Sequence, residues 1–277
     1  MDMKTANKIV RRMEATSGAD VRKAKFSLPY KVGVDLGTSN IVLTVLDNED
    51  RPVAYAIRPA SVVRDGIVVE FISAVGILTE LKAQMEERLG TALNKAATAI
   101  PPGILPGNSK VMTNVVAGAG FDVINVIDEP EAAALALGVQ DGAVVDMGGG
   151  TTGVSLLRGG KVELSMDEPT GGTHMSLVLA GNLNVDFAQA ERFKQDPKNY
   201  KQVFPVIRPV AEKMADITKK VIASHDVQTI YLAGGTSCLK NIEGVFKDYI
   251  GIPTYKPANP LLITPIGIAM SVQSAGG

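Results

Sequence analysis

The chain has 277 residues, of which 45% are hydrophobic and 21% are charged, and this balance excludes an intrinsically disordered chain. Its net charge of −1 provides no broad attraction to nucleic acid or to an anionic membrane. The single cysteine excludes an internal disulfide, and no apolar stretch approaches the roughly 20 residues that span a bilayer, so we expect a cytoplasmic protein without a transmembrane segment.

The first 28 residues are rich in lysine and arginine and differ from the rest of the chain. Met3, Ala6, Val10 and Met13 follow helical spacing, which predicts a short amphipathic helix. No apolar core of a secretory signal is present. Residues 1–28 are interpreted as a flexible or amphipathic tail. It would be free, docked on a partner or shell protein, or bound at a membrane surface.

Residues 29–141 are predicted to form a first α/β domain, domain I, because strand and helix patterns alternate along them. Gly90 stands where a helix C-terminal glycine belongs, and Pro130 lies near the first turn of a helix, where its missing N–H costs little. The predicted strands are 31–46 with a turn, 52–57, 67–69, 96–100 and 123–127; the predicted helices are 73–89, 110–119 and 129–137.

Residues 142–259 restart with three strands and are predicted to form a second, similar domain, domain II. Pro205 and Pro209 are expected to restrict the regular part of its longest helix to residues 210–224. Residues 260–277 are expected to return to domain I as a last helix. The predicted strands are 143–146, 153–158, 161–166 and 229–232; the predicted helices are 174–180, 185–194, 202–224, 239–249 and 263–273.

Two glycine-rich segments, Val32–Asn40 and Val144–Thr152, share one design. In each, a hydrophobic run leads to an aspartate, then to glycine and hydroxyl residues, and a second hydrophobic run follows. This pattern predicts a strand, a tight glycine turn and a returning strand. Clustered backbone N–H groups in such a turn bind anions, and the aspartate is placed to hold a hydrated cation. The duplication indicates a fold that holds a nucleotide polyphosphate from both sides.

Five segments in a fixed order resemble the actin and heat-shock chaperone ATPase superfamily. The two glycine segments resemble its phosphate loops, and the remaining three resemble its first connection, its adenosine loop and its second connection. One glycine motif alone would be weak evidence, whereas the ordered set is specific. The last three segments are Asp128–Ala134, Leu232–Thr236 and Pro265–Ala269. The resemblance implies an actin-like ATPase (ribonuclease H-like) α/β fold, with two similar mixed-sheet domains around a nucleotide cleft and reduced outer subdomains.

Four further segments resemble the EutJ family, small chaperone-like proteins of bacterial ethanolamine utilisation: Ser61–Val68, Gly171–His174, Glu212–Ile217 and Leu232–Gly235. This resemblance implies an ATP-binding, weakly hydrolysing protein that assists pathway enzymes or shell proteins and associates with a microcompartment. It implies ATP or ADP and Mg²⁺ as cofactors, protein clients rather than nucleic acid, and a monomer or weak homo-oligomer.

The superfamily resemblance also assigns site residues. Asp35 and Asp146 would face each other and hold Mg²⁺ through water, although either could merely cap a turn. Glu129 would position the attacking water, or it could only stabilise the N-terminus of its helix. The phosphate contacts would come from Gly37, Thr38, Ser39, Asn40, Gly148, Gly149, Gly150, Thr151 and Thr152.

Adenosine would lie beside Gly234, Gly235, Thr236 and Ser237. Two charged residues, Glu191 and Lys194, resemble an adenosine-contacting helix, but a pair at this spacing is also typical of a solvated helix face. Gly171 and Gly172 could line the γ-phosphate side or only form a turn. His174, His225 and Cys238 have no ligand cluster at metal spacing and are interpreted as structural.

Two departures weaken the expectation of rapid hydrolysis. Gly153 stands where the heat-shock chaperones carry an acidic residue, and the catalytic lysine of those chaperones has no clear counterpart, with Arg64 as a candidate basic substitute. Two alternatives to a chaperone-like role therefore stay open. One is an actin-like filament, suggested by Arg64–Ile67, and the other is an inert nucleotide-binding scaffold, suggested by Gly153.

Overall fold

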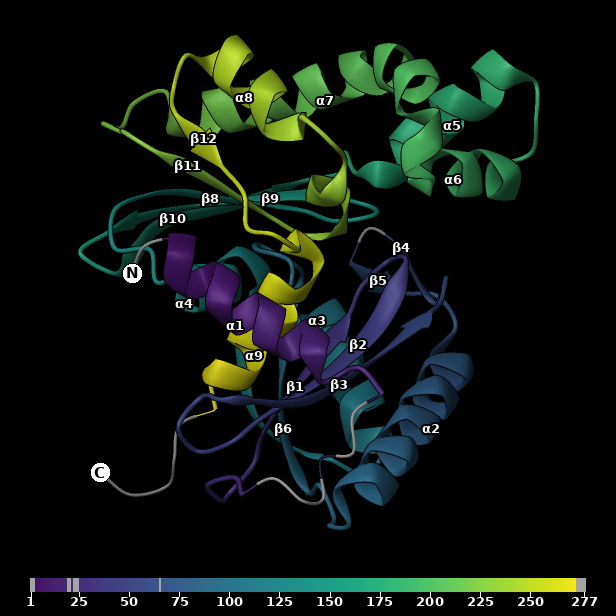
Figure 1. Ribbon diagram of the computed structural model, residues 1–277, viewed down its shortest axis with the longest axis vertical. Helices are drawn as coiled ribbons and strands as arrows, with labels where there is room; N and C mark the ends of the chain where they lie inside the picture. Colours follow the sequence, from purple (N-terminus) through teal and green to yellow (C-terminus); the bar gives the residue numbers. More distant parts are fainter. Residues whose placement is uncertain (1–2, 19–20, 22–24, 65, 273–277) are drawn as a thin grey trace.

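Two five-stranded mixed sheets organise the molecule into two lobes (Figure 1). The computed structural model describes residues 3–18, 21, 25–64 and 66–272. Both sheets have the same topology, with three antiparallel strands continued by two parallel ones. In lobe I the order is β3-β2-β1-β6-β7, and in lobe II it is β10-β9-β8-β11-β12. The shared topology is the structural counterpart of the duplicated glycine segments.

Lobe I is built on β1 (Lys31–Leu36), β2 (Asn40–Leu46), β3 (Pro52–Pro59), β6 (Lys95–Ile100) and β7 (Asp122–Asp128). A small hairpin of β4 (Val63–Arg64) and β5 (Ile67–Val68) precedes α2 (Phe71–Leu89), which ends at Gly90 with φ 68°. Helix α3 (Pro106–Gly118) starts one turn earlier than the sequence predicts, because Pro106 fits the first helical turn. Helices α2 and α3 pack against this sheet around one apolar core.

Lobe II is built on β8 (Gly142–Met147), β9 (Thr152–Arg158), β10 (Lys161–Glu168), β11 (Ile230–Ala233) and β12 (Thr254–Tyr255). Its helices are α5 (Gly172–Leu183), α6 (Phe187–Gln195), α7 (Tyr200–Ile222) and α8 (Ile242–Ile250), with short 3₁₀ turns at Pro197–Asn199 (η1) and Gly235–Cys238 (η2). A second apolar core lies between these helices and the sheet.

The prediction that Pro205 and Pro209 confine the long helix to residues 210–224 is wrong, since α7 starts at Tyr200 and contains both prolines. Both prolines lie on the exposed side of the helix, where water can hydrate the carbonyl groups that lose their i→i−4 partners. The opposite side buries an apolar stripe that includes Val203, Ile207 and Ala211. Packing of this stripe against lobe II outweighs the local cost of the prolines.

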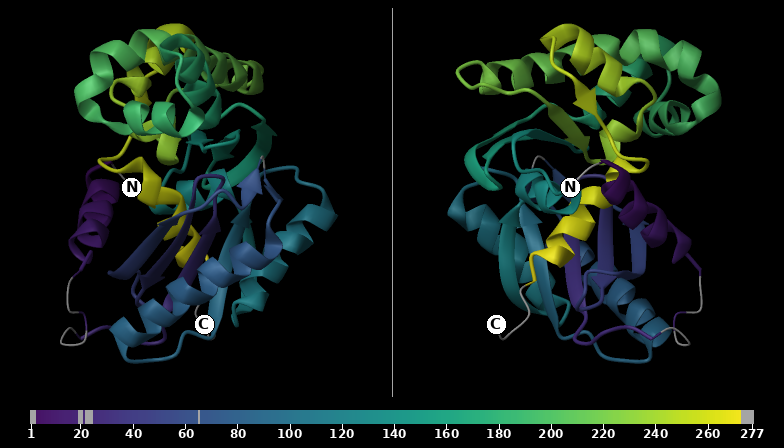
Figure 2. Two further views of the ribbon diagram at one scale, coloured as in Figure 1. Left: turned by 90° about the vertical axis from the view of Figure 1, so that its right-hand side faces the viewer. Right: turned by 60° about the vertical axis from the view of Figure 1, so that its left-hand side comes forward.

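Three helices form a layer between the two sheets (Figure 2): α1 (Met3–Ala15), α4 (Glu129–Leu137) and α9 (Ile263–Met270). Their buried residues share one apolar core with Leu46 of lobe I and with Val144, Leu157 and Ala233 of lobe II. Helix α9 follows a 3₁₀ turn at Pro260–Leu262 (η3) and packs on β1, β2 and β6. The chain therefore returns to lobe I after completing lobe II.

Helix α1 lies in the segment interpreted from sequence as a flexible or amphipathic tail. Its apolar residues Ala6, Val10 and Met13 are fully buried in the core between the sheets. Asn7 accepts a hydrogen bond from the Ala258 backbone at 2.6 Å, and Glu14 accepts one from the Asn259 side chain at 2.8 Å. The helix thus spans from β3 of lobe I to the segment that precedes η3. In the described part of the chain no helix is long and apolar enough to cross a membrane.

Candidate functional site

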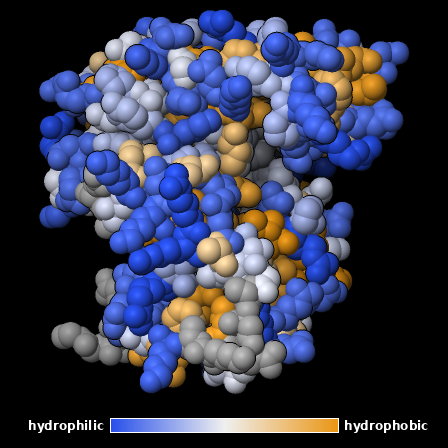
Figure 3. All heavy atoms as spheres, viewed as in Figure 1, coloured by the Kyte–Doolittle hydropathy of each residue, from blue (hydrophilic) through white to orange (hydrophobic). Residues whose placement is uncertain are grey.

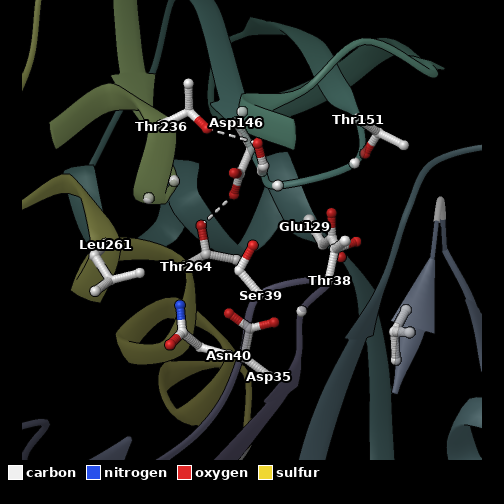
Figure 4. Close-up of a pocket in the computed structure, with 18 of the residues that line it drawn as sticks. Asp35, Thr38, Ser39, Asn40, Glu129, Asp146, Thr151, Thr236, Leu261 and Thr264 are labelled. Carbon is white, nitrogen blue, oxygen red and sulfur yellow. Dashed lines mark hydrogen bonds between the residues drawn. The ribbon is translucent and has the colours of Figure 1, made fainter. Parts of the chain in front are cut away.

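The site starts from two equivalent hairpins. Asp35 is the fifth of six residues in β1, and Asp146 is the fifth of six in β8. Each strand then turns through glycine and returns as the antiparallel partner, β2 or β9. Because the sheets have the same topology, both aspartates come to the ends of equivalent strands and face the space between the lobes (Figure 4).

The two glycine turns line one cleft of about 380 Å³. The turns approach each other at Gly149 and Ser39, because a Cβ on Gly149 would lie 2.4 Å from the Ser39 hydroxyl oxygen. Any larger residue at this position would require at least the Ser39 side chain to move. The predicted phosphate-contacting residues in the lining are Gly37, Thr38, Ser39, Asn40, Gly148, Gly149, Gly150 and Thr151.

Two predicted residues lie outside the lining. The Thr152 hydroxyl donates to the Thr170 carbonyl at 2.6 Å, and the Ser237 hydroxyl donates to the Ala233 carbonyl. Both side chains are fully buried. Their hydroxyl groups hold the backbone of the two loops, while the neighbouring residues Thr151 and Thr236 line the cleft.

Three carboxyl groups converge in the cleft, from Asp35, Glu129 and Asp146. Burial away from water raises the pKa of Asp35 to about 7, and the nearby Asp146 carboxylate adds to this rise. The pKa of Asp146 rises to about 6 because the side chain is buried, although a hydrogen bond from Thr264 opposes the shift. Burial also raises the pKa of Glu129, with Asp146 and Asp35 contributing next. A cation at this place would relieve the mutual repulsion of the three groups.

The donor set fits Mg²⁺ bound through water. Among the described residues no three His, Cys, Asp or Glu side chains are close enough to form a direct metal cage. Mg²⁺ commonly keeps several waters and uses one or two carboxylates together with phosphate oxygens. Asp35 and Asp146 supply oxygen ligands of this kind on opposite sides of the cleft. The residues therefore suit a hydrated divalent ion bound together with a polyphosphate.

The lining contributed by lobe II includes an ion pair that is largely buried. Lys194 Nζ lies 2.9 Å from the Glu191 carboxylate and donates to the Gly172 carbonyl and to the Ser176 hydroxyl at 2.9 and 2.7 Å. Burial lowers the pKa of Lys194, against the opposing effect of Glu191. For Glu191, burial favours a higher pKa, but Lys194 and three hydrogen bonds lower it below the ordinary value. The pair is thus part of the cleft wall, not a solvated pair on an open helix face.

Gly234, Gly235 and Thr236 also line the cleft, and Leu239 and Leu261 add apolar surface to the lining. The Thr236 hydroxyl donates to the Gly148 carbonyl at 2.7 Å, which ties the predicted adenosine loop to the second glycine turn. Gly172 also lines the cleft, and a Cβ on it would lie 2.4 Å from the Thr236 hydroxyl oxygen. A planar base could stack against Leu239 and Leu261 while its phosphates reach the two turns.

Sequence reasoning missed several lining residues, Leu261 and Thr264 among them. The Thr264 hydroxyl donates to Asp146, as Figure 4 shows. The only signal in the sequence is that both stand just before Pro265–Ala269, the segment that resembles the second connection. That resemblance places a helix there but does not indicate which side chains reach the cleft.

The structure also locates Gly153 and Arg64, the two positions at which the sequence departs from the heat-shock chaperone pattern. Gly153 pairs across the strands with Asp167, and a Cβ on Gly153 would lie 3.4 Å from an Asp167 carboxylate oxygen. Arg64 is exposed on β4, while its neighbours Val63 and Gly66 line the cleft. Within the described part of the chain, Lys194 is the only lysine or arginine that lines the cleft, and it is held by Glu191.

Comparison with known sequences places these features in a family context. The family model described as "Hsp70 protein" matches residues 65–233. The ethanolamine utilization protein EutJ of Salmonella typhimurium is 38% identical over 262 residues, which cover 94% of this chain and 92% of that protein. The match therefore extends over nearly the whole of both chains.

Solved structures agree. The crystal structure of EutJ from Carboxydothermus hydrogenoformans matches with a TM-score of 0.89 and 45% identity, covering 98% of this chain and 99% of that chain. MreB5 of Spiroplasma citri, bound to AMPPNP, matches with a TM-score of 0.71 at 17% identity over 88% of this chain and 96% of that chain. The second likeness concerns the fold alone. Together they confirm the actin-like ATPase fold that the sequence predicts.

Proposed function

Because this chain belongs to the EutJ family, within the actin and Hsp70 ATPase superfamily, we propose that it is an ATP-binding, weakly hydrolysing, chaperone-like protein of ethanolamine utilisation. It would assist the assembly or maintenance of pathway enzymes or of their microcompartment in the cytoplasm. Its clients would be proteins, and nucleotide binding would change the relation of the two lobes and so change a client-binding surface.

The observation that carries the proposal is the pair of equivalent glycine turns on one cleft, with Asp35 and Asp146 at equivalent strand ends. Backbone N–H groups in both turns would bind the phosphates, and the aspartates would hold Mg²⁺ through water. When bound, Mg²⁺ would neutralise charge on the phosphate oxygens. Glu129 would orient a water molecule for attack.

Slow hydrolysis is expected from the same cleft. No free lysine or arginine faces the turns among the described lining residues, because Lys194 is engaged by Glu191. A positioned cation in this role is typically worth several orders of magnitude in phosphoryl transfer, so its absence favours binding over turnover. Nucleotide occupancy, and not rapid hydrolysis, would then set the conformation.

Isothermal titration calorimetry with AMPPNP, a non-hydrolysable ATP analogue, tests the binding function. Wild-type protein is expected to bind with Mg²⁺, and Asp146→Ala is expected to lose the Mg²⁺-dependent part of the affinity. Asp141→Ala is the matched control, because Asp141 lies just before β8, accepts a hydrogen bond from the Gly159 backbone and is not part of the cleft lining. Equal, undetectable binding by wild type and Asp146→Ala would reject the proposal.

Phosphate release assays separate the chaperone-like ATPase from an inert scaffold. We expect a turnover that is slow but above background with ATP and Mg²⁺, and reduced further in Glu129→Gln. Tight AMPPNP binding combined with phosphate release at background would instead favour the scaffold. Client binding is tested by pulling down ethanolamine-pathway enzymes and shell proteins with and without nucleotide; no nucleotide-dependent partner would contradict the chaperone-like role.

An actin-like filament is the second candidate, favoured by apolar surface on lobe I. Ile67 and Ile72 are 46% and 86% exposed beside the β4–β5 hairpin, and Leu105 is 71% exposed before α3. Figure 3 shows apolar side chains at the surface on this flank of the molecule. Exposed patches of this kind commonly mark contacts between proteins. Sedimentation with ATP and Mg²⁺ distinguishes the candidates, because a pelletable polymer that Ile72→Lys abolishes would favour the filament.

A further inference from the structure

One side chain from the lobe I face of the cleft holds an aspartate of lobe II. Thr264 is the second residue of α9, it is 3% exposed, and its hydroxyl donates to Asp146. Asp146 belongs to β8 of the other sheet. Of the three converging carboxyl groups, Asp146 is the one that receives a side-chain hydrogen bond in the described structure. This contact was not among the site features expected from sequence.

Helix α9 holds Thr264 in a fixed place. The Thr44 hydroxyl of β2 donates to the Pro265 carbonyl at 2.7 Å. Gly33 of β1 lies so close to α9 that a Cβ on it would be 2.5 Å from the Ala269 nitrogen. The helix N-terminus is therefore fastened to the lobe I sheet immediately beside Thr264, and the threonine cannot follow Asp146 if the lobes separate.

The second oxygen of Asp146 is confined as well. A Cβ on Gly234 would lie 2.2 Å from Asp146 Oδ1, so the glycine backbone packs directly on the carboxylate. The Gly234 N–H donates to the Pro260 carbonyl at 3.1 Å, which connects this loop to the start of η3. Asp146 is thus held between its own lobe and the segment that leads into α9.

We propose that Thr264 is a positioning residue that fixes the Asp146 carboxylate from the opposite lobe and thereby couples lobe arrangement to cation-assisted nucleotide binding. The inference rests on the proposed nucleotide-binding function and extends it to a residue that has no role there. The hydroxyl donor stabilises the negative carboxylate in one orientation despite the repulsion from Asp35 and Glu129. Without it, Asp146 would turn away from the other two groups before the cation and phosphates arrive.

The experiment uses full-length protein with Thr264→Val, which replaces the hydroxyl by a methyl group of similar volume, and Thr264→Ser, which keeps the donor. AMPPNP affinity is measured by calorimetry with Mg²⁺ and with EDTA. We expect Thr264→Val to weaken binding with Mg²⁺ about tenfold, as for loss of a hydrogen bond to a charged group, and to leave binding in EDTA unchanged. Thr264→Ser should retain most of the Mg²⁺-dependent gain.

Thr218→Val is the matched control, because it removes a buried threonine hydrogen bond, to the Met214 carbonyl, within α7 and outside the cleft lining. It should lower the melting temperature but keep the Mg²⁺-dependent gain. If wild-type protein binds AMPPNP with Mg²⁺ and Mg²⁺ increases the AMPPNP affinity of Thr264→Val by the same factor, the positioning role is overturned and the proposed function is not. Equal loss in Thr264→Ser and Thr264→Val would also overturn it, because the donor would then be irrelevant.

A ligand-free measurement keeps this inference separable from the proposed function. Melting temperatures are compared for Thr264→Val, Asp146→Ala and the double variant, without nucleotide or metal. Non-additive effects are expected if the two side chains act as a unit, whereas additive effects would reject the contact as a positioning device. If wild-type protein does not bind AMPPNP, the proposed function and the coupling of Thr264 to nucleotide binding are both overturned. Non-additive melting temperatures would in that case show only that Thr264 and Asp146 contact each other.

Discussion

At the scale of single residues, the cleft shows a conflict between stability and binding. Asp35, Glu129 and Asp146 all have a raised pKa because they are buried, and for Asp35 and Glu129 nearby carboxylates add to the rise. Such groups destabilise the ligand-free fold when they ionise, and they are retained where a bound cation can use their charge. The residues that would bind the proposed cation thus destabilise the fold until it binds.

Replacing Asp35 by asparagine should therefore stabilise the ligand-free protein. Removal of the charge relieves repulsion with Asp146, and we expect a gain of about 1 kcal/mol, or about 2–4 °C in melting temperature. The same change should abolish the Mg²⁺-dependent gain in AMPPNP affinity. Differential scanning calorimetry and titration calorimetry measure the two effects. Asp122→Asn, an exposed aspartate at the start of β7, is the control and should change neither; a destabilised Asp35→Asn would contradict the prediction.

The raised pKa of Asp35 also makes the stability of the ligand-free protein depend on pH. The pKa of Asp35 rises from 3.8 to about 7 on folding, so the folded state holds this proton more tightly than the unfolded chain does. Its contribution to stability is fully present below about pH 4 and is lost as the pH rises to about 7. The difference in melting temperature between Asp35→Asn and wild type should grow over this range without ligand. A constant difference between pH 4 and pH 8 would show that Asp35 is not the group responsible.

At the scale of elements, helix α1 shows how a segment that reads as a tail becomes part of a core. Its spacing of apolar residues predicts an amphipathic helix, but the sequence cannot say which surface covers the apolar face. In the structure that face is buried between β3, α4 and the segment before η3. The exposed side carries Lys4, Lys8, Arg11 and Arg12, which are four of the seven lysines and arginines of residues 1–28.

Disrupting the buried face of α1 should affect both stability and nucleotide binding. Val10→Asp places a charge in the core between the lobes, and we expect the melting temperature to fall by about 5 °C or more. Loss of the hydrogen bonds that Asn7 and Glu14 accept from residues 258 and 259 should also loosen the segment that carries Leu261 and weaken AMPPNP binding about fivefold. Lys8→Asp adds a carboxylate to the exposed side of the same helix and should leave both unchanged. Wild-type behaviour of Val10→Asp would mean that α1 does not support the cleft.

At the scale of the whole molecule, the two lobes are joined through a close crossing of α4 and α9. A Cβ on Gly267 would lie 1.7 Å from the Ala132 carbonyl oxygen, so the helices touch backbone to backbone. Both helices belong to the layer between the sheets, and each leads from one lobe to the other. The distance between α4 and α9 is therefore expected to influence how far apart the two lobes lie at the cleft.

Gly267→Ala should separate α4 from α9, because neither backbone can yield locally. We expect a loss of about 3 kcal/mol, at the upper end for overpacking, with a matching fall in melting temperature and weaker AMPPNP binding. Gly76→Ala is the control: it also lies within a helix, α2, but its Cβ would meet no atom within 4 Å, so it should stabilise slightly. Circular dichroism and calorimetry measure both variants; a Gly267→Ala protein as stable as wild type would contradict this account of the crossing.

The sequence by itself determined the strand–turn–strand hairpins, the order of the five family segments and hence the family and fold. These are local or ordered patterns: glycine and aspartate at a strand end identify a phosphate turn wherever the strand is placed. Most strands and helices lie close to their predicted ranges for the same reason. The predicted phosphate residues from Gly37 to Asn40 and from Gly148 to Thr151 do line one cleft.

Only the tertiary structure decided the features that depend on contacts between distant segments. The start of α7 at Tyr200, despite two prolines, follows from burial of one face of the helix. The burial of α1 depends on a surface made by both lobes, and the Thr264–Asp146 bond joins residues 118 positions apart. No local pattern records such partners, because a side chain's neighbours across a packed interface are set by the arrangement of whole elements.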